Sequence, residues 1–119
     1  MNIKNDLYNP LQNSSTMSSW IVTMTGSLVD LRTIVHSDFD FQTLYPCPYR
    51  DPLGEPTDDR CYNWCLEHWG TPECARDVVM TYEEEDSMTC TFVTSRWPRG
   101  LFAYLKERFP QLRITYPSN

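Results

Sequence analysis

The order in which strand-like and helical patterns follow one another constrains the fold of this chain more than any single motif. Outside residues 37–76 the order is strand, helix, strand, strand, helix, strand. Two strand–helix–strand units in succession are typical of the split β-α-β arrangement of ferredoxin-like folds. The sequence therefore predicts an α+β domain over residues 19–119 with an insertion at 37–76. Two helices would cover one face of a four-stranded antiparallel sheet, and the other face would be solvated or covered by the insertion or a partner.

Four segments carry the β-rich, alternating pattern of half-buried strands: residues 20–25, 77–82, 88–94 and 112–116. The acidic run from Glu83 to Asp86 separates the second segment from the third and predicts a solvated hairpin loop. Its carboxylates are also candidates for an acid/base pair, a hard-cation site or a contact with a basic partner.

Helical patterns follow the first and the third predicted strand. Ser27, with Asp30 three residues later, predicts the start of a helix that runs to about His36. Pro98 suits the first turn of another helix over residues 97–109.

The insertion is predicted to hold one helix and much irregular chain. Phe39, Phe41 and Leu44 indicate a short extended piece. Four prolines (Pro46, Pro48, Pro52 and Pro56) exclude a regular helix after it. Asp58 or Asp59 then begins the inserted helix, which ends at about His68 before Gly70 and Pro72.

Residues 1–18 are polar and lack periodicity, so they predict an N-terminal arm that is mobile unless it lies on its own domain or on a neighbouring chain. This segment has no hydrophobic signal core, and no apolar run approaches the roughly 20 residues that cross a bilayer. The five cysteines are expected to be mostly reduced thiols.

The charge of the chain bears on its partners. Its 16 acidic and 10 basic residues give a net charge of −6. This balance argues against non-specific binding of nucleic acid or of an anionic membrane surface. It favours a partner with a basic surface.

Residues 61–74, CYNWCLEHWGTPEC, contain a candidate metal site. Cys61, Cys65 and His68 share one helical face, and Cys74 follows after a turn. Three thiolates and one imidazole suit tetrahedral zinc. The spacing lacks a Cys-x-x-Cys knuckle, however, and buried free cysteines commonly serve as small apolar residues. We therefore expect packing, with neither metal nor cofactor.

The same segment offers a candidate catalytic pair. A nucleophilic thiol needs a base within hydrogen-bond reach and a third group that orients it. Cys65 and His68 are the nearest such pair, but three residues on one helix do not make a triad. We therefore expect no enzymatic activity.

Three tryptophans, Trp64, Trp69 and Trp97, each bring a large apolar area and an indole N–H that needs a partner. We interpret them as packing that joins the insertion to the sheet. The alternative is a base-stacking platform on the sheet.

Three stretches (FDFQTLYPCP, WCLEHWGT and FVTSRWP) together resemble the YubB-like ferredoxin-like domain family of phages, plasmids and related mobile elements. The likeness spans roughly residues 20–116. The chain departs from the family pattern at Pro72-Glu73, where the family has Lys-Trp. The resemblance implies a ferredoxin-like fold and a viral or mobile-element setting, without catalytic residues. It is carried by Phe39, Phe41, Pro46, Pro48, Trp64, Trp69, Gly70, Thr71, Phe92, Thr94, Trp97 and Pro98.

These observations together predict a non-enzymatic viral or mobile-element protein that acts by binding other proteins, in a virion or in the host cytoplasm. In one version it is a minor, capsid-associated structural component whose arm bridges neighbours. In the other it is a soluble accessory factor that inhibits a host protein through an acidic surface. A zinc or thiol-based site at Cys61, Cys65, His68 and Cys74 stays as a third alternative.

Overall fold

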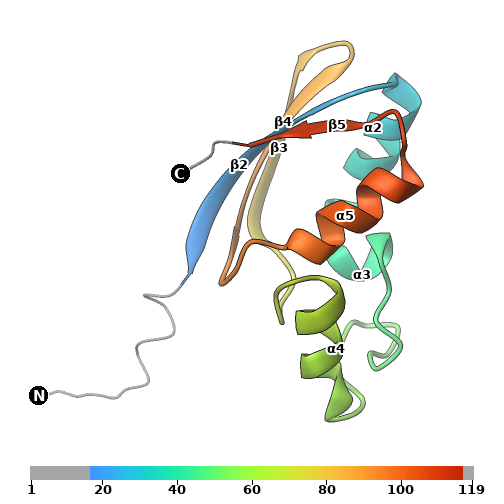
Figure 1. Ribbon diagram of the computed structural model, residues 1–119, viewed down its shortest axis with the longest axis vertical. Helices are drawn as coiled ribbons and strands as arrows, with labels where there is room; N and C mark the ends of the chain where they lie inside the picture. The colour runs from blue at the N-terminus through green and yellow to red at the C-terminus, as the bar shows by residue number, and fades with distance from the viewer. Residues whose placement is uncertain (1–16, 117–119) are drawn as a thin grey trace, which may run out of the picture.

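The computed structural model describes residues 17–116 and has an α+β architecture (Figure 1). Along the chain its elements are β2 (Ser18–Thr25), α2 (Leu28–His36), α3 (Phe41–Leu44), α4 (Arg60–His68), β3 (Arg76–Glu84), β4 (Ser87–Thr94), α5 (Arg99–Arg108) and β5 (Arg113–Thr115).

The four strands form one antiparallel sheet in the order β3-β4-β2-β5. β2 pairs with β4 along its whole length, from Ser18 opposite Thr94 to Thr25 opposite Ser87. β5 is short and pairs only with the segment Thr23–Thr25 of β2. The predicted four-stranded antiparallel sheet is confirmed.

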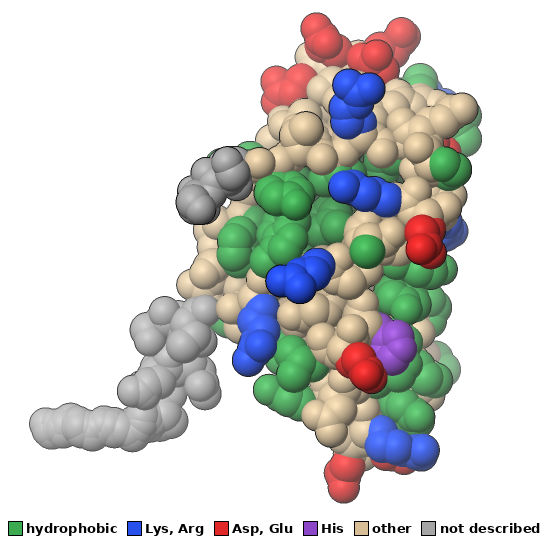
Figure 2. Space-filling model, viewed as in Figure 1, with side chains coloured by type: hydrophobic (Ala, Val, Ile, Leu, Met, Phe, Trp, Pro, Cys, Tyr) green, Lys and Arg blue, Asp and Glu red, His purple; other side chains and the backbone are tan. Residues whose placement is uncertain are grey.

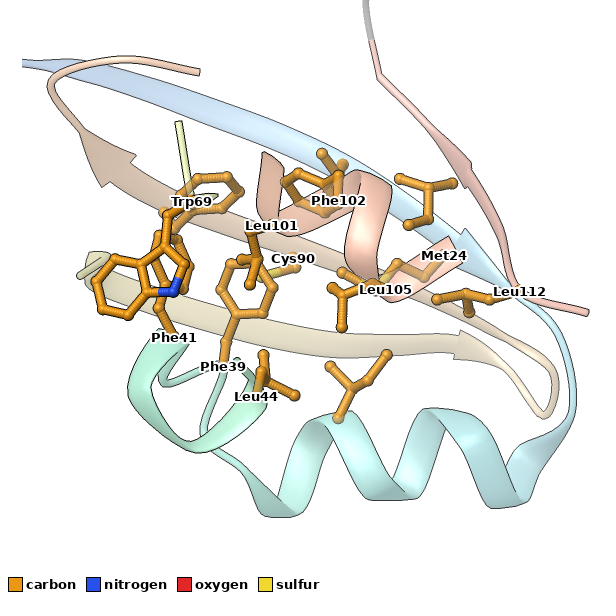
Figure 3. Close-up of a cluster of buried hydrophobic side chains, with 14 of the residues drawn as sticks. Met24, Phe39, Phe41, Leu44, Trp69, Cys90, Leu101, Phe102, Leu105 and Leu112 are labelled. Carbon is orange, nitrogen blue, oxygen red and sulfur yellow. The ribbon is translucent and has the colours of Figure 1, made fainter. Parts of the chain in front are cut away.

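The core lies between one face of the sheet and the helices, which gather on that side (Figure 1). Alternate residues of β2 and β4 point into it, as the period of a half-buried strand requires. Side chains of the sheet, the insertion and α5 converge there (Figure 3). The largest fully buried ones are Trp69, Phe39, Phe41, Phe92, Met24, Leu31, Ile34, Leu44, Met88, Leu101, Leu105 and Val22.

The second face of the sheet is not covered by the described part of the chain. Ile21 is 53% exposed and Val79 is 58% exposed on this face. A row of threonines crosses all four strands beside them: Thr81, Thr89, Thr23 and Thr115. The insertion packs with the helices instead, so this face is left to solvent or to a partner.

The predicted helix starts are confirmed. Ser27 caps α2, because its Oγ accepts a hydrogen bond of 3.1 Å from the backbone N–H of Asp30. Asp58 Oδ1 accepts one of 2.9 Å from the N–H of Arg60 where α4 begins. α5 starts immediately after Pro98.

The prediction of an extended piece at Phe39–Leu44 was wrong. The chain turns through left-handed conformations at Asp38 (φ 56°) and Phe39 (φ 55°) and then forms the short helix α3. Asp40 caps this helix by accepting hydrogen bonds from the N–H and the hydroxyl of Thr43. Helical spacing sends Phe41 and Leu44 into the core together. The insertion therefore holds two helices instead of one.

Most of the predicted N-terminal arm, residues 1–16, lies outside the described residues. Its last residue, Ser18, is the first residue of β2. Within residues 17–116 no helix combines the length and the apolarity needed to cross a membrane.

Candidate functional site

Three cysteine side chains meet in the interior of the insertion. Cys61 and Cys65 lie one turn apart on α4, and their Sγ atoms are 4.0 Å apart. Cys47 comes from the loop after α3, and its Sγ is 3.9 Å from that of Cys61. All three Sγ atoms lie within 4.8 Å of one another, and all three residues are buried. We call this set the thiol cluster.

The position of Cys47 is fixed by hydrogen bonds as well as by the flanking residues Pro46 and Pro48. The side-chain amide of Gln42 accepts from the N–H of Cys47 and donates to its carbonyl, each at 3.1 Å. The N–H of Tyr49 donates to Cys47 Sγ at 3.4 Å. The loop therefore presents this sulfur to α4 in a defined position.

A cation borders the thiol cluster. Arg50 Nη2 donates to Cys65 Sγ at 3.9 Å, and its Nη1 donates to the carbonyl of Gly54 at 2.7 Å. The guanidinium lies over the Trp69 ring at 5.2 Å from the centroid. Its Nε is buried and has no hydrogen-bond partner.

The other two residues of the predicted metal site lie elsewhere. The His68 ring stacks on Trp64 with 4.1 Å between centroids, and its Nδ1 is 2.9 Å from the carbonyl oxygen of Trp64. Cys74 Sγ donates to Asp40 Oδ1 at 3.6 Å. The structure thus brings together Cys61 and Cys65 from the predicted set and adds Cys47. Cys47 and Cys61 are 14 positions apart in the sequence and most of the chain between them is irregular, so no periodic signal indicated this contact.

Burial favours the neutral form of two thiols of the candidate set, Cys65 and Cys74. Burial raises the pKa of Cys65 to about 12, although the guanidinium of Arg50 acts in the opposite direction. Burial also raises the pKa of Cys74. A protonated, buried thiol is a poor nucleophile. Cys65 and His68 bond to different partners, so the geometry gives no support to the candidate catalytic pair.

A close contact between the end of α4 and the start of α5 forms a rigid corner of the molecule. Trp69 is fully buried, and its indole N–H donates to the carbonyl of Tyr45 at 2.8 Å. Gly70 has φ +94°, and a Cβ there would lie 2.7 Å from the backbone N of Arg99. A Cβ on Gly100 would lie still closer to the backbone of His68 at the end of α4. Both positions require glycine because the backbones of the two helix ends are in contact, which leaves no room for a Cβ atom.

Thr71 and Glu73 extend this corner to the end of β4. The carboxylate of Glu73 accepts hydrogen bonds from the N–H of Ser95 at 2.8 Å, from the hydroxyl of Ser95 at 2.9 Å and from the hydroxyl of Thr71. Thr71 is fully buried. The WGT stretch therefore packs the insertion against the sheet and the start of α5.

The other tryptophans pack in two further places. Trp64 stacks on His68 and meets Tyr45 edge-on. Trp97 stacks on Phe102 with centroids 4.8 Å apart, and it also contacts Trp20 and Tyr116 (centroid distances 5.3 Å and 4.5 Å). The second group is half-exposed, and Tyr116 is 49% exposed. We call Trp20, Trp97 and Tyr116 the aromatic patch.

The aromatic patch adjoins an unpaired strand edge. β5 pairs with Thr23–Thr25 only, so Ser18–Val22 has no strand beside it on the β5 side among the described residues. In an antiparallel strand alternate residues direct their N–H and C=O groups to each side. This part of β2 therefore presents backbone groups without a strand partner among the described residues, next to the half-buried rings of Trp20 and Trp97 and the exposed ring of Tyr116.

Aromatic residues of the sheet lie on the wrong face for a base-stacking platform. Trp20 and Phe92 are paired partners and contact the helical side, and Tyr82 pairs with the core residue Met88. Among the described strand residues none of the open-face side chains is aromatic. The predicted alternative of base stacking gains no support.

Charged side chains border two hollows at the surface. Acidic side chains gather at the tip of the β3–β4 hairpin, at the top of Figure 2. Glu83, Glu84 and Glu85 border an open hollow of about 420 Å³ that Arg32 also lines. A second hollow of about 480 Å³ lies beside Trp97 and is lined by Arg96 and Arg99, with Glu67.

Comparison of the chain with models of protein families, with curated proteins and with solved structures finds no match. The resemblance to the YubB-like family therefore stays a prediction.

Proposed function

We propose that the protein is non-enzymatic and binds another protein through the unpaired edge of β2, with the aromatic patch as the apolar part of the interface. The partner adds an extended segment beside Ser18–Val22. The setting is a viral or mobile-element particle in which the chain is a minor structural component. The observation that carries the proposal is a strand edge that no described strand covers, beside partly exposed aromatic rings.

The contrast with the opposite edge of the sheet supports this choice. β3 is also an edge strand, but its pairing with β4 shifts between Arg76 and Val79 and again between Tyr82 and Glu84. Bulges and charged residues are the usual devices that keep an edge from pairing with other chains. The segment Ser18–Val22 has no charge, no proline and a continuous register. Of the two sheet edges in residues 17–116, this one is the better suited to strand addition.

The surroundings of the aromatic patch indicate the chemistry of the partner segment. Lys and Arg side chains border apolar side chains between the sheet and α5 (Figure 2). Arg96 and Arg99 line the hollow beside Trp97. A segment with an apolar residue facing Trp97 and a carboxylate near these arginines is therefore favoured, despite the net charge of the whole chain.

We also propose that the fold belongs to the ferredoxin-like class. The strand order places β4 between the two strands of the first β-α-β unit, and β2 between the two strands of the second. Such interlocking of two units is the arrangement named by the split β-α-β description. The resemblance to the YubB-like family supports it independently.

A pair of photo-crosslinking variants tests the interface. Ile21 and Val79 lie on the same sheet face with exposures of 53% and 58%, but beside opposite edges. A photoreactive amino acid is incorporated at position 21 or at position 79 of the chain. The variant is expressed in cells that carry the viral or mobile-element genome that encodes it. We expect a cross-link to one defined protein from position 21 and none from position 79. Equal cross-linking from both positions, or none from either, contradicts the edge proposal.

Particle fractionation tests the setting separately. The chain is expected in purified particles, and the Ile21→Lys variant is expected to be excluded from them while Val79→Lys enters normally. If the unmodified chain is absent from purified particles, the structural role is contradicted. The proposal that the β2 edge binds a protein is then tested by the cross-linking alone.

A second candidate function is a soluble accessory factor that inhibits a host protein by binding it through an acidic surface. The exposed acids at the tip of the β3–β4 hairpin favour it. Replacement of Glu83, Glu84 and Glu85 by Gln removes that charge without touching the core. If the triple variant still inhibits the host protein, this candidate function is contradicted.

A further inference from the structure

The thiol cluster has the spacing of sulfur atoms around a bound metal ion. A zinc–thiolate bond is about 2.3 Å, so two thiolates on one tetrahedral ion lie about 3.8 Å apart. The measured separations are 3.9 Å for Cys47–Cys61 and 4.0 Å for Cys61–Cys65, and no separation within the cluster exceeds 4.8 Å. An ion at the centre requires sulfur movements of only a few tenths of an ångström for the first two pairs.

We propose that Cys47, Cys61 and Cys65 form a binding site for a thiophilic divalent cation, with zinc as the ion and three thiolates as its protein ligands. The set differs from the one that the sequence predicts, because Cys47 takes a place that His68 and Cys74 do not occupy. Binding converts three thiols and Zn²⁺ into a tris-thiolate complex of charge −1 and releases three protons. The site is independent of the unpaired edge of β2.

Arg50 balances the charge of this complex. Three thiolates and a divalent ion leave one negative charge in a buried place, which is costly unless it is paired. The guanidinium of Arg50 already donates to Cys65 Sγ, and its charge of +1 makes the group neutral. The buried Nε of Arg50 lacks an acceptor, and a negative group beside it offsets that cost. A monovalent ion would leave a charge of −2, so the charge count favours a divalent one.

The groups around the sulfurs are arranged as supports of a metal site. The N–H of Tyr49 donates to Cys47 Sγ, and Gln42 holds the backbone of Cys47 on both sides. Cys61 lies in the first turn of α4, where the helix dipole favours a thiolate. Donors to the ligand atoms and a rigid backbone are the features that orient metal ligands in proteins.

The alternative is a packed corner in which the three thiols act only as small apolar residues. Two other buried or half-buried cysteines provide matched controls. Cys90 is fully buried on β4 and its thiol has no hydrogen-bond partner among the described residues. Cys74 bonds to Asp40 outside the cluster.

The experiment uses the full chain, purified under reducing conditions without chelator. We expect about one zinc per chain by elemental analysis. After removal of the metal, titration with Cd²⁺ should give a sulfur-to-cadmium charge-transfer band that saturates at one ion per chain. Cys47→Ser and Cys65→Ser should abolish the band, while Cys90→Ser and Cys74→Ser keep it. Arg50→Met should weaken binding about 10- to 100-fold, as expected for a group that supports a ligand.

A measurement on the unmodified chain keeps the proposal falsifiable if a variant fails to fold. Alkylation of the denatured, still metal-loaded protein compared with the chelated one counts protected thiols by mass. If the metal dissociates on denaturation, alkylation of the metal-loaded protein and of the chelated protein is compared under native conditions instead, at a temperature at which the buried thiols become exposed slowly. Protection of Cys47, Cys61 and Cys65 is expected. No bound zinc or cadmium, or an equal loss of binding in Cys90→Ser or Cys74→Ser, overturns the site.

Discussion

Replacement of Gly100 by alanine should destabilise the protein, although the same change stabilises an ordinary helix. Gly100 is the second residue of α5 and faces the end of α4. A Cβ at this position would lie 2.7 Å from the carbonyl carbon of His68, 3.2 Å from that of Trp69, and closer still to the His68 carbonyl oxygen. These are backbone atoms, so no side chain can rotate away to make room.

The expected magnitude is a sum of three contributions. Helix propensity favours alanine by about 1 kcal/mol. Overpacking of a filled interface costs about 1–3 kcal/mol. If the helices separate, the bond from the N–H of Leu101 to the carbonyl of Trp69, 3.0 Å long, is lost from a buried place at about 1–3 kcal/mol. The net free energy of unfolding should therefore fall by about 3 kcal/mol, which lowers the melting temperature by about 15 °C for a domain of this size.

Urea unfolding followed by tryptophan fluorescence measures this change, with a thermal melt as a second reading. Ala103→Gly is the matched control, because Ala103 is an exposed residue of the same helix and its replacement should cost only about 1 kcal/mol. A Gly100→Ala protein as stable as the unmodified one, or more stable, would refute the argument that the two backbones touch at this corner.

Three further predictions concern stability. Trp69→Phe removes the indole N–H that donates to the Tyr45 carbonyl and should lower the free energy of unfolding in urea by about 2 kcal/mol; no change would mean that this bond is unimportant. Glu73→Gln removes a carboxylate that accepts several hydrogen bonds and should also cost about 2 kcal/mol, whereas Glu85→Gln in the exposed hairpin should cost almost nothing. Burial raises the pKa of Cys90 from 9.0 to about 12, so the folded state holds its proton longer than the unfolded state and stability is lost as pH rises above 9.0. From about pH 8 to about pH 10 this thiol should account for a loss of about 1.4 kcal/mol in metal-free protein. Cys90→Ala should show a correspondingly weaker pH dependence in urea titrations, and an unchanged dependence contradicts the assignment.

The strands and the longer helices were predictable because their signals are local. The alternation in β2 and β4 sorts core from surface residues with a period of two, and Ser27 marks the start of α2 by its own hydrogen bond. The short helix α3 was missed because four residues are too few to show a helical period. The local signal for this helix is Asp40, which caps it.

The candidate metal site shows what helical spacing can and cannot predict. It correctly placed Cys61 and Cys65 on one face of α4. It also placed His68 on that face, but the imidazole is held by Trp64, one turn back along the same helix. Spacing gives the direction of a side chain from its own helix. It does not give the rotamer, or the residue that a neighbouring loop brings to the same place.

The sequence by itself determined the four strands and the three longer helices and which of their side chains turn inward, because backbone sterics and apolar periodicity act over a few residues. Tertiary structure alone decided that Cys47 joins Cys61 and Cys65, because a proline-bounded loop packs against α4 across 14 residues of chain. It also decided that no described strand covers the first half of β2 on its β5 side, because β5 is three residues long and lies beside the other end of β2.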